Sequence, residues 1–170
     1  MSITMHSASV PVFARMLKNL SAILDKAEQH AEARKFDVAV LLGARLAPDM
    51  LPFTRQVLIA CDSAKFAISR LSGVDAPTFP DTEKTMGELK ERIAKTIEYV
   101  RSVPAEKING TEDKAVSVPI RGMEPLQFSG ENYLKHHALP NFYFHVTTAY
   151  DLLRHNGVQL GKADFLGRPE

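Results

Sequence analysis

Hydrophobic residues recur every three or four positions along four long stretches of the chain, with polar and charged residues between them. A stripe that fills about three positions in seven is typical of a helix with one face turned toward a core. The pattern therefore predicts four amphipathic helices. Local signals place their ends near residues 9 and 34, 49 and 72, 85 and 104, and 140 and 156.

Capping residues mark the ends of the second and third expected helices. Asp49 is the expected N-cap of the second helix, with Pro52 still inside its first turn. Gly73 follows the last apolar position of that helix, where a glycine commonly ends a helix. Thr85 and Glu88 form a T-x-x-E capping box, so the third helix should begin just after Thr85.

Helical spacing disappears between the third and fourth helices. Residues 116–120 and 123–128 are rich in β-formers and flank the Arg-Gly pair at 121–122, which predicts a small β-hairpin. Ser129 is the expected N-cap of a short helical turn after the hairpin. Pro140 should interrupt or kink the chain before the fourth helix, because a proline removes a helical hydrogen bond.

Together these elements predict an all-α fold, an up-down four-helix bundle with a long crossover that carries the β-hairpin. A length of 170 residues suits a single domain over residues 1–170. The hydrophobic content of 45% is sufficient for a sizeable core.

Charge and composition exclude several classes of function. The net charge of +1 gives no electrostatic case for binding nucleic acid or an acidic membrane surface. No apolar run approaches the roughly 20 residues of a membrane-spanning helix. The N-terminus lacks the pattern of a secretory signal, and Cys61, the single cysteine, cannot form an internal disulfide. We therefore expect a cytoplasmic protein.

The second helix has two unusual faces. Its inward positions are mostly small, which lets a neighbouring helix approach closely or leaves space for a ligand; they include Ala60, Cys61, Ala64 and Ala67. Ile59 and Phe66 form an apolar strip on the opposite side of the same helix. A helix that is apolar on two sides is either sandwiched or lies at a subunit contact.

His145 is the main candidate for chemistry, in a stretch from Asn132 to Gly157 that holds four of the six histidines. It occupies a core-facing position of the fourth helix where a leucine would be expected, and Asn141 and Thr148 lie one turn to either side. One interpretation is a buried histidine held by a hydrogen bond to a neighbouring helix. The other is a ligand or acid–base group that lines a cavity of the bundle.

A polar strip inside a core needs hydrogen-bonding partners. Gln56, Asp62 and Lys65 of the second helix are the nearest candidates to supply them, and we take His145, Asn141, Thr148, Gln56 and Asp62 as candidate pocket residues.

Spacing argues against a three-histidine metal site. The residue four before His145 is Asn141, the residue four after it is Ala149, and the second helix contains no histidine.

The remaining reactive side chains have simpler interpretations. His136, His137 and His155 are expected to be exposed or interfacial, and Cys61 to be a small buried hydrophobe. The charged loop that contains Asp81, Glu83 and Lys84 is expected to be solvated surface.

Two long strings resemble a known family. They are LAPDMLPFTRQVLIACDSAKFAISRLSG (residues 46 to 73) and LPNFYFHVTTAYDLLRHNGVQLGKADFLG (residues 139 to 167). They resemble a bacterial and fungal family of unknown function that is grouped with the DinB/YfiT-like metalloenzymes, and the likeness spans essentially the whole chain. The resemblance implies a DinB-like four-helix bundle and a homodimer.

The wider superfamily also implies a metal site. Its members bind a divalent metal, often nickel or zinc, through one histidine of the second helix and a His-x-x-x-His pair of the fourth, and some are thiol-dependent transferases or hydrolases. Only His145 matches a position of that pair here, with Asn141 or Ala149 at the other.

Three functional hypotheses follow. The first is a small-molecule-binding bundle with a core pocket lined by the fourth helix, in which the metal site is degenerate and no cofactor is needed. The second is a metal-dependent transferase or hydrolase that uses His145 with unusual ligands such as Gln56 or Asp62. The third is a non-catalytic dimer whose polar strip only fixes the helix register. The identity of the ligand and the type of reaction stay open at this point.

Overall fold

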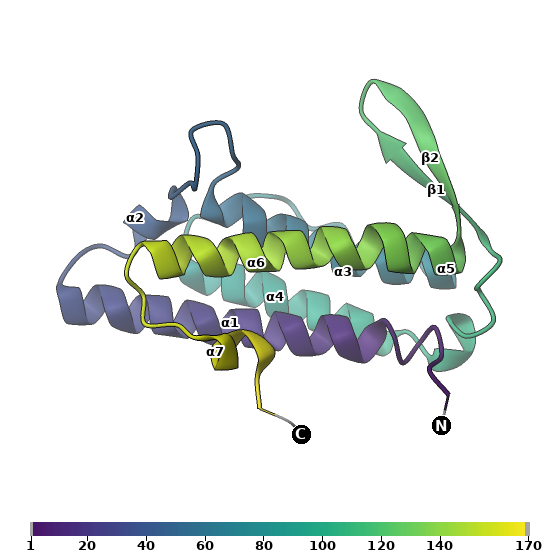
Figure 1. The fold of residues 1–170 in the computed structure, drawn as a ribbon, viewed down its shortest axis with the longest axis horizontal. Helices are drawn as coiled ribbons and strands as arrows, with labels where there is room; N and C mark the ends of the chain where they lie inside the picture. The colour runs from purple at the N-terminus through teal and green to yellow at the C-terminus, as the bar shows by residue number, and fades with distance from the viewer. Residues whose placement is uncertain (1, 169–170) are drawn as a thin grey trace.

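The computed structural model of the protein describes residues 2–168 and is mostly helical. Four long helices lie side by side: α1 (Val10–Arg34), α3 (Phe53–Ser72), α4 (Met86–Ser102) and α6 (Leu139–His155) (Figure 1). Helix α3 packs against both α6 and α4, and α1 packs mainly against α4. Within residues 2–168, no helix is long and apolar enough to cross a membrane.

Shorter elements join and flank the long helices. They are α2 (Ala39–Leu42), the 3-10 turn η1 (Ala105–Lys107), the strands β1 (Ala115–Ile120) and β2 (Met123–Ser129), α5 (Gly130–Tyr133), the π-helical segment η2 (Leu134–Ala138) and α7 (Lys162–Leu166). The tail folds back over the helices and places α7 along α1. Lys26 binds Asp164 at 2.6 Å, and Asn19 donates a hydrogen bond to the Phe165 carbonyl.

The core is formed by the apolar stripes that define the helices in the sequence. Leu17 and Leu20 of α1, Ile68 of α3 and Leu89 of α4 are fully buried. Phe13 of α1 meets Phe142 of α6 edge-on, with ring centroids 4.9 Å apart. Burying one such side chain contributes about 1.5–3 kcal/mol, so the stripes are the main stabilising feature of the fold.

Helix α3 begins later than the sequence predicts. Its N-cap is Pro52 rather than Asp49, and the first helical residue is Phe53. The Phe53 amide donates a hydrogen bond to the Ala44 carbonyl, and the Thr54 hydroxyl donates to the Leu42 carbonyl. The long-range contacts of this connection therefore determine where the helix starts. The capping box of Thr85 and Glu88 at the start of α4 is confirmed.

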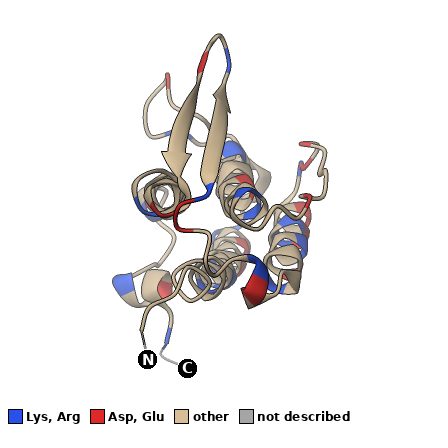
Figure 2. Cartoon of the chain, turned by 90° about the vertical axis from the view of Figure 1, so that its right-hand side faces the viewer, with Lys and Arg blue, Asp and Glu red and all other residues tan. Residues whose placement is uncertain are grey.

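The predicted hairpin is present and stands out from the helices (Figures 1 and 2). Strands β1 and β2 are antiparallel, and Val118 pairs with Leu126. Gly122 adopts a φ of 76° in the turn, a conformation that favours glycine. Val116 and Val118 of β1 are buried at the base of the ribbon, whereas β2 is almost entirely exposed.

Pro140 does not interrupt the last long helix, in contrast to the sequence-based expectation. Segments α5, η2 and α6 follow one another without a break from Gly130 to His155. Proline lacks an amide proton, and its ring clashes with the carbonyl four residues earlier, here that of His136. His136 lies in the π-helical segment, whose wider turn accommodates the ring without ending the helix.

Candidate functional site

A cavity of about 200 Å³ lies between α3 and the helix formed by η2 and α6, beside the base of the hairpin. Ile59, Phe66, Val118 and Ala138 form apolar parts of its wall. Polar side chains from α3, α5, η2 and α6 complete the lining: Asp62, Ser63, Arg70, Tyr133, His137 and Asn141. We call this space the α3–α6 cavity.

Asn141 and Ser63 connect the two walls of this cavity. The Asn141 amide nitrogen donates a hydrogen bond to the Ser63 hydroxyl oxygen at 2.8 Å. The Ser63 hydroxyl proton and the Asn141 amide oxygen form no other bond among the described residues. The pair therefore offers the cavity one donor and one acceptor.

Arg70, Tyr133 and His137 form an aromatic and cationic wall. The Arg70 guanidinium lies over the rings of Phe66 and Tyr133, at 5.3 and 5.7 Å from their centroids, and donates a hydrogen bond to the Tyr133 hydroxyl at 2.9 Å. The His137 ring stacks on Tyr133 at 5.8 Å and lies 5.4 Å from Phe128 of β2. Burial and the charge of Arg70 lower the pKa of His137, which favours its neutral form.

Sequence reasoning did not find this wall, because it treated His137 as exposed or interfacial and separated it from the fourth helix at Pro140. The missed signal is the spacing of Tyr133, His137 and Asn141 at four-residue intervals, which places all three along one helical face.

His145 lies nearby on α6 but does not line the α3–α6 cavity. Its ring is buried, with 8% of the residue exposed, and its Nδ1 lies 2.7 Å from the amide oxygen of Gln56 on α3. The Gln56 amide nitrogen donates to the Leu51 carbonyl, so the oxygen faces His145 and accepts its Nδ1 proton. Burial lowers the pKa of His145, so the ring is neutral with its lone pair on Nε2.

The five candidate residues from the sequence fall into separate groups. Asn141 and Asp62 line the α3–α6 cavity, whereas His145 and Gln56 bind each other outside its lining. Thr148 is buried and donates a hydrogen bond to the Phe144 carbonyl of its own helix.

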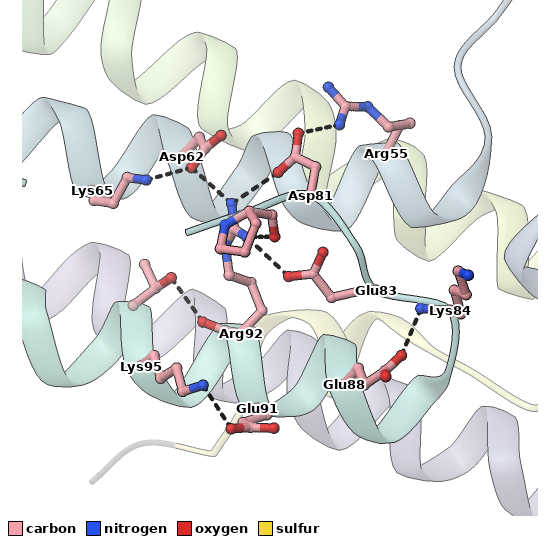
Figure 3. Close-up of polar contacts among 12 residues, drawn as sticks. Arg55, Asp62, Lys65, Asp81, Glu83, Lys84, Glu88, Glu91, Arg92 and Lys95 are labelled. Carbon is pink, nitrogen blue, oxygen red and sulfur yellow. Dashed lines mark hydrogen bonds and ion pairs between the residues drawn. The ribbon is translucent and has the colours of Figure 1, made fainter. Parts of the chain in front are cut away.

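Arg92 of α4 is the centre of a second polar region that the sequence did not reveal (Figure 3). Its side chain is 2% exposed and contacts three carboxylates: Asp62 at 3.2 Å, Asp81 at 3.2 Å and Glu83 at 2.9 Å. Its guanidinium lies 4.9 Å from the centroid of the Phe79 ring. Although burial opposes the charged form, Asp62 and Glu83 raise the pKa of Arg92.

Two further cations complete this Arg92 network. Lys65 binds Asp62 at 2.9 Å with only 4% of its side chain exposed, and Arg55 binds Asp81 at the outer edge. Three cations therefore meet three carboxylates, as Figure 3 shows. The expectation of a solvated loop around Asp81 and Glu83 is wrong for Glu83, whose side chain is only 10% exposed.

A hollow of about 240 Å³ beside Arg92 and a surface hollow of about 340 Å³ beside His30 are both larger than the α3–α6 cavity. In the first, Glu83 pairs with Arg92 and Glu91 with Lys95, and the Glu88 carboxylate accepts hydrogen bonds from backbone amides. Cys61 is fully buried, and burial raises its pKa to about 12, so it is not a nucleophile at neutral pH.

Comparison with known protein families shows to which family the chain belongs. A family model described as a domain of unknown function, DUF1993, matches residues 5–166. The chain belongs to the DUF1993 family. A comparison with curated proteins finds no match.

A solved structure extends this DUF1993 assignment to the fold. The crystal structure of a DinB family member protein from Shewanella denitrificans is 42% identical in sequence. The match covers 96% of this chain and 92% of that chain, with a TM-score of 0.87. The resemblance to the DinB-like superfamily noted from the sequence is confirmed.

The residues of this DUF1993 chain do not fit the three-histidine metal site of that superfamily. The side chain of α3 that faces His145 is the amide of Gln56, and Asn141, four residues before His145, is bonded to Ser63. The carboxylate of Asp62 is bound by Lys65 and Arg92. Within residues 2–168, no three His, Cys, Asp or Glu side chains form a group that could hold a metal ion.

Proposed function

We propose that this DUF1993 protein binds a small molecule in the α3–α6 cavity, with the superfamily metal site degenerate. The observation that carries this proposal is the meeting of six polar side chains with an apolar part of the wall, formed by Ile59, Phe66, Val118 and Ala138, in one cavity. Ligand sites commonly combine apolar walls with a few convergent polar groups. Arg70, Ser63 and Asn141 each keep hydrogen-bonding capacity that no described residue uses.

The size of the cavity limits the ligand. A volume of about 200 Å³ is below the roughly 300–1,000 Å³ of typical ligand pockets, so we expect a small metabolite rather than a nucleotide cofactor. The π-helical segment supports the choice of this cavity, because such segments occur frequently at functional sites and this one contributes His137 and Ala138 to the wall.

A thermal-shift screen of the full chain against a metabolite panel tests the proposal. A ligand present at 100 times its Kd should stabilise the protein by about 2.7 kcal/mol. Ser63→Leu should remove the stabilisation, because the larger side chain fills the cavity from α3. Thr147→Val is the matched control, since Thr147 is exposed on α6 outside the cavity. A ligand that binds Ser63→Leu as well as wild type would place the site elsewhere.

The competing proposal is a divalent-metal-dependent transferase or hydrolase built around His145. The free lone pair on His145 Nε2 favours it, because neutral imidazole nitrogen is a common metal ligand. Elemental analysis of untagged protein decides between the two. Stoichiometric nickel or zinc that disappears in His145→Ala would establish a metal site at His145 and contradict the degenerate site.

We also propose that the chain folds as a DinB-like up-down four-helix bundle and forms a homodimer. Large apolar side chains are exposed on α3, β2 and α6, the elements around the cavity: Phe66, Met123, Leu126 and Phe144. Exposed apolar groups of this kind are typical of subunit contacts. In analytical ultracentrifugation, the double variant Phe66→Glu, Phe144→Glu should be monomeric where the wild type is a dimer.

A further inference from the structure

Arg70 is a cation that no carboxylate of the described residues neutralises. Its guanidinium donates one hydrogen bond, to the neutral hydroxyl of Tyr133 at 2.9 Å. Among residues 2–168, no carboxylate forms an ion pair with it. A guanidinium carries five N–H donors and stays charged in proteins, so several donors remain for another partner.

The position of the Arg70 side chain is fixed by its neighbours. Phe66 and Tyr133 both lie against the guanidinium, and the Tyr133 hydroxyl holds one end of it. Such cation–π contacts orient the planar group and leave most of its N–H donors available for another partner. An arginine held in this way on a cavity wall loses little further freedom when it binds an anion.

The rest of the cavity wall favours a single negative charge. Asp62 is the one carboxylate on this wall, and its charge is offset by Lys65 at 2.9 Å and Arg92 at 3.2 Å. Ser63 can donate its hydroxyl proton toward the same space. One uncompensated guanidinium suits a monoanion, whereas a phosphate dianion would need a second cation.

From this arrangement we infer that the ligand of the α3–α6 cavity is a small organic carboxylate, bound through the guanidinium of Arg70. Its carboxylate accepts hydrogen bonds from Arg70, and its apolar body lies against Ile59 and Val118. This inference rests on the proposed function, since it specifies the ligand class of the same cavity.

The test compares acids with their neutral amides. Calorimetry and thermal shift of the full chain are run with benzoate, butanoate, benzamide, butanamide and inorganic phosphate. We expect at least one carboxylate to bind about tenfold more tightly than its amide, because a carboxylate carries the opposite charge and can accept two parallel hydrogen bonds from the guanidinium, whereas an amide offers one neutral oxygen. Inorganic phosphate should bind more weakly than that carboxylate.

Variants assign the preference to Arg70. Arg70→Met should abolish the preference for acid over amide, and Arg70→Lys should retain part of it, because lysine keeps the charge but not the bidentate geometry. Arg101→Met is the matched control and should retain the full preference, since Arg101 is exposed on α4 away from the cavity. Urea unfolding of each variant shows that the fold is intact.

The outcomes separate the two proposals. Equal binding of acid and amide that is lost in Ser63→Leu would overturn the carboxylate inference but support a small-molecule site. An acid preference that survives in folded Arg70→Met, or phosphate bound as tightly as the carboxylate, would also overturn the inference. Absence of binding by every probe, at concentrations that reveal a millimolar Kd, would reject the carboxylate site, whereas the metabolite panel would still test the cavity.

Discussion

Arg92 and Arg70 both lie against aromatic rings, but they differ in whether carboxylates pair with them. Both guanidinium groups lie over aromatic rings: Arg92 over Phe79 at 4.9 Å, and Arg70 over Phe66 and Tyr133. Arg92 contacts three carboxylates, whereas Arg70 contacts none among the described residues. An arginine whose charge is satisfied within the fold stabilises the structure, whereas one without a counter-charge is available for a ligand.

Their positions explain this difference. Arg92 binds α4 to Asp62 of α3 and to the loop that carries Asp81 and Glu83, so it connects both helices with the loop between them (Figure 3). Arg70 faces a cavity beside the hairpin, and among residues 2–168 its guanidinium hydrogen-bonds to Tyr133 alone. The first arrangement is typical of a structural ion network, in which each charge has a partner. The second leaves the donors of a charged group facing a cavity, an arrangement that suits the binding of a ligand.

The largest effect should come from removing the charge of Arg92. Arg92→Met should lower the free energy of unfolding by about 3–5 kcal/mol, because Glu83 and Asp62 keep their charges without the cation between them. Arg70→Met should lower it by less than about 1 kcal/mol, since only a stacking contact and one hydrogen bond are lost. Urea unfolding measures both. Equal losses would contradict the distinction between the two arginines.

Asp62 lies both in the Arg92 network and on the wall of the α3–α6 cavity, so one substitution tests both regions. Asp62→Asn should lower the free energy of unfolding by about 1–3 kcal/mol, because the buried ammonium of Lys65 loses its carboxylate partner. Carboxylate binding in the cavity should not weaken, since the lost charge is negative. Urea unfolding measures the change in stability, and calorimetry with benzoate measures the binding. Loss of binding at unchanged stability would instead make Asp62 a ligand contact.

Much of the fold was predictable because it depends on local sequence patterns. The apolar stripes of the four long helices, the Thr85 capping box and the hairpin around Gly122 all match the structure. Predictions failed where contacts with another segment, or an irregular helical turn, decide the outcome. The start of α3 depends on Ala44 and Leu42, and the uninterrupted helix at Pro140 depends on a π-helical segment.

The candidate site was less predictable, for the same reason. Asn141 was found because a polar side chain on an apolar stripe is visible in the sequence. Arg70 was missed because nothing local shows that a surface-like arginine lacks a carboxylate partner. Arg92 was missed because its burial depends on Asp62 and Glu83, which lie 30 and 9 residues away.

His145 should make the free energy of unfolding depend on pH, with a smaller effect than the loss of a charge from the Arg92 network. Its folded-state pKa is lowered by burial, so between that value and the unfolded value of about 6.5 the unfolded chain binds more protons. Stability should therefore fall as the pH drops below about 6.5. His145→Gln, whose amide can still donate to Gln56, should show a weaker dependence in urea unfolding between about pH 5 and 7. An unchanged slope would mean that other groups, such as His137, are responsible.

The smallest expected effect concerns the outer edge of the Arg92 network. Although slight burial opposes it, the bonds from Arg55 and Arg92 lower the pKa of Asp81. The folded-state pKa lies below the unfolded value of about 3.9, so the stabilisation is present above that value and is lost as the pH falls through the folded pKa. Asp81 is 38% exposed, so solvent screening limits the effect to about 0.2–1 kcal/mol.

Acid titration of Asp81→Asn tests this edge. The variant should lose less stability than wild type as the pH falls below about 4, and added salt should reduce the difference because exposed charges are screened. Asp151→Asn, at an exposed position of α6 with no ion pair among the described residues, is the matched control. An acid sensitivity as large as the loss in Arg92→Met would show that Asp81, rather than buried Glu83, carries most of the network's stabilisation.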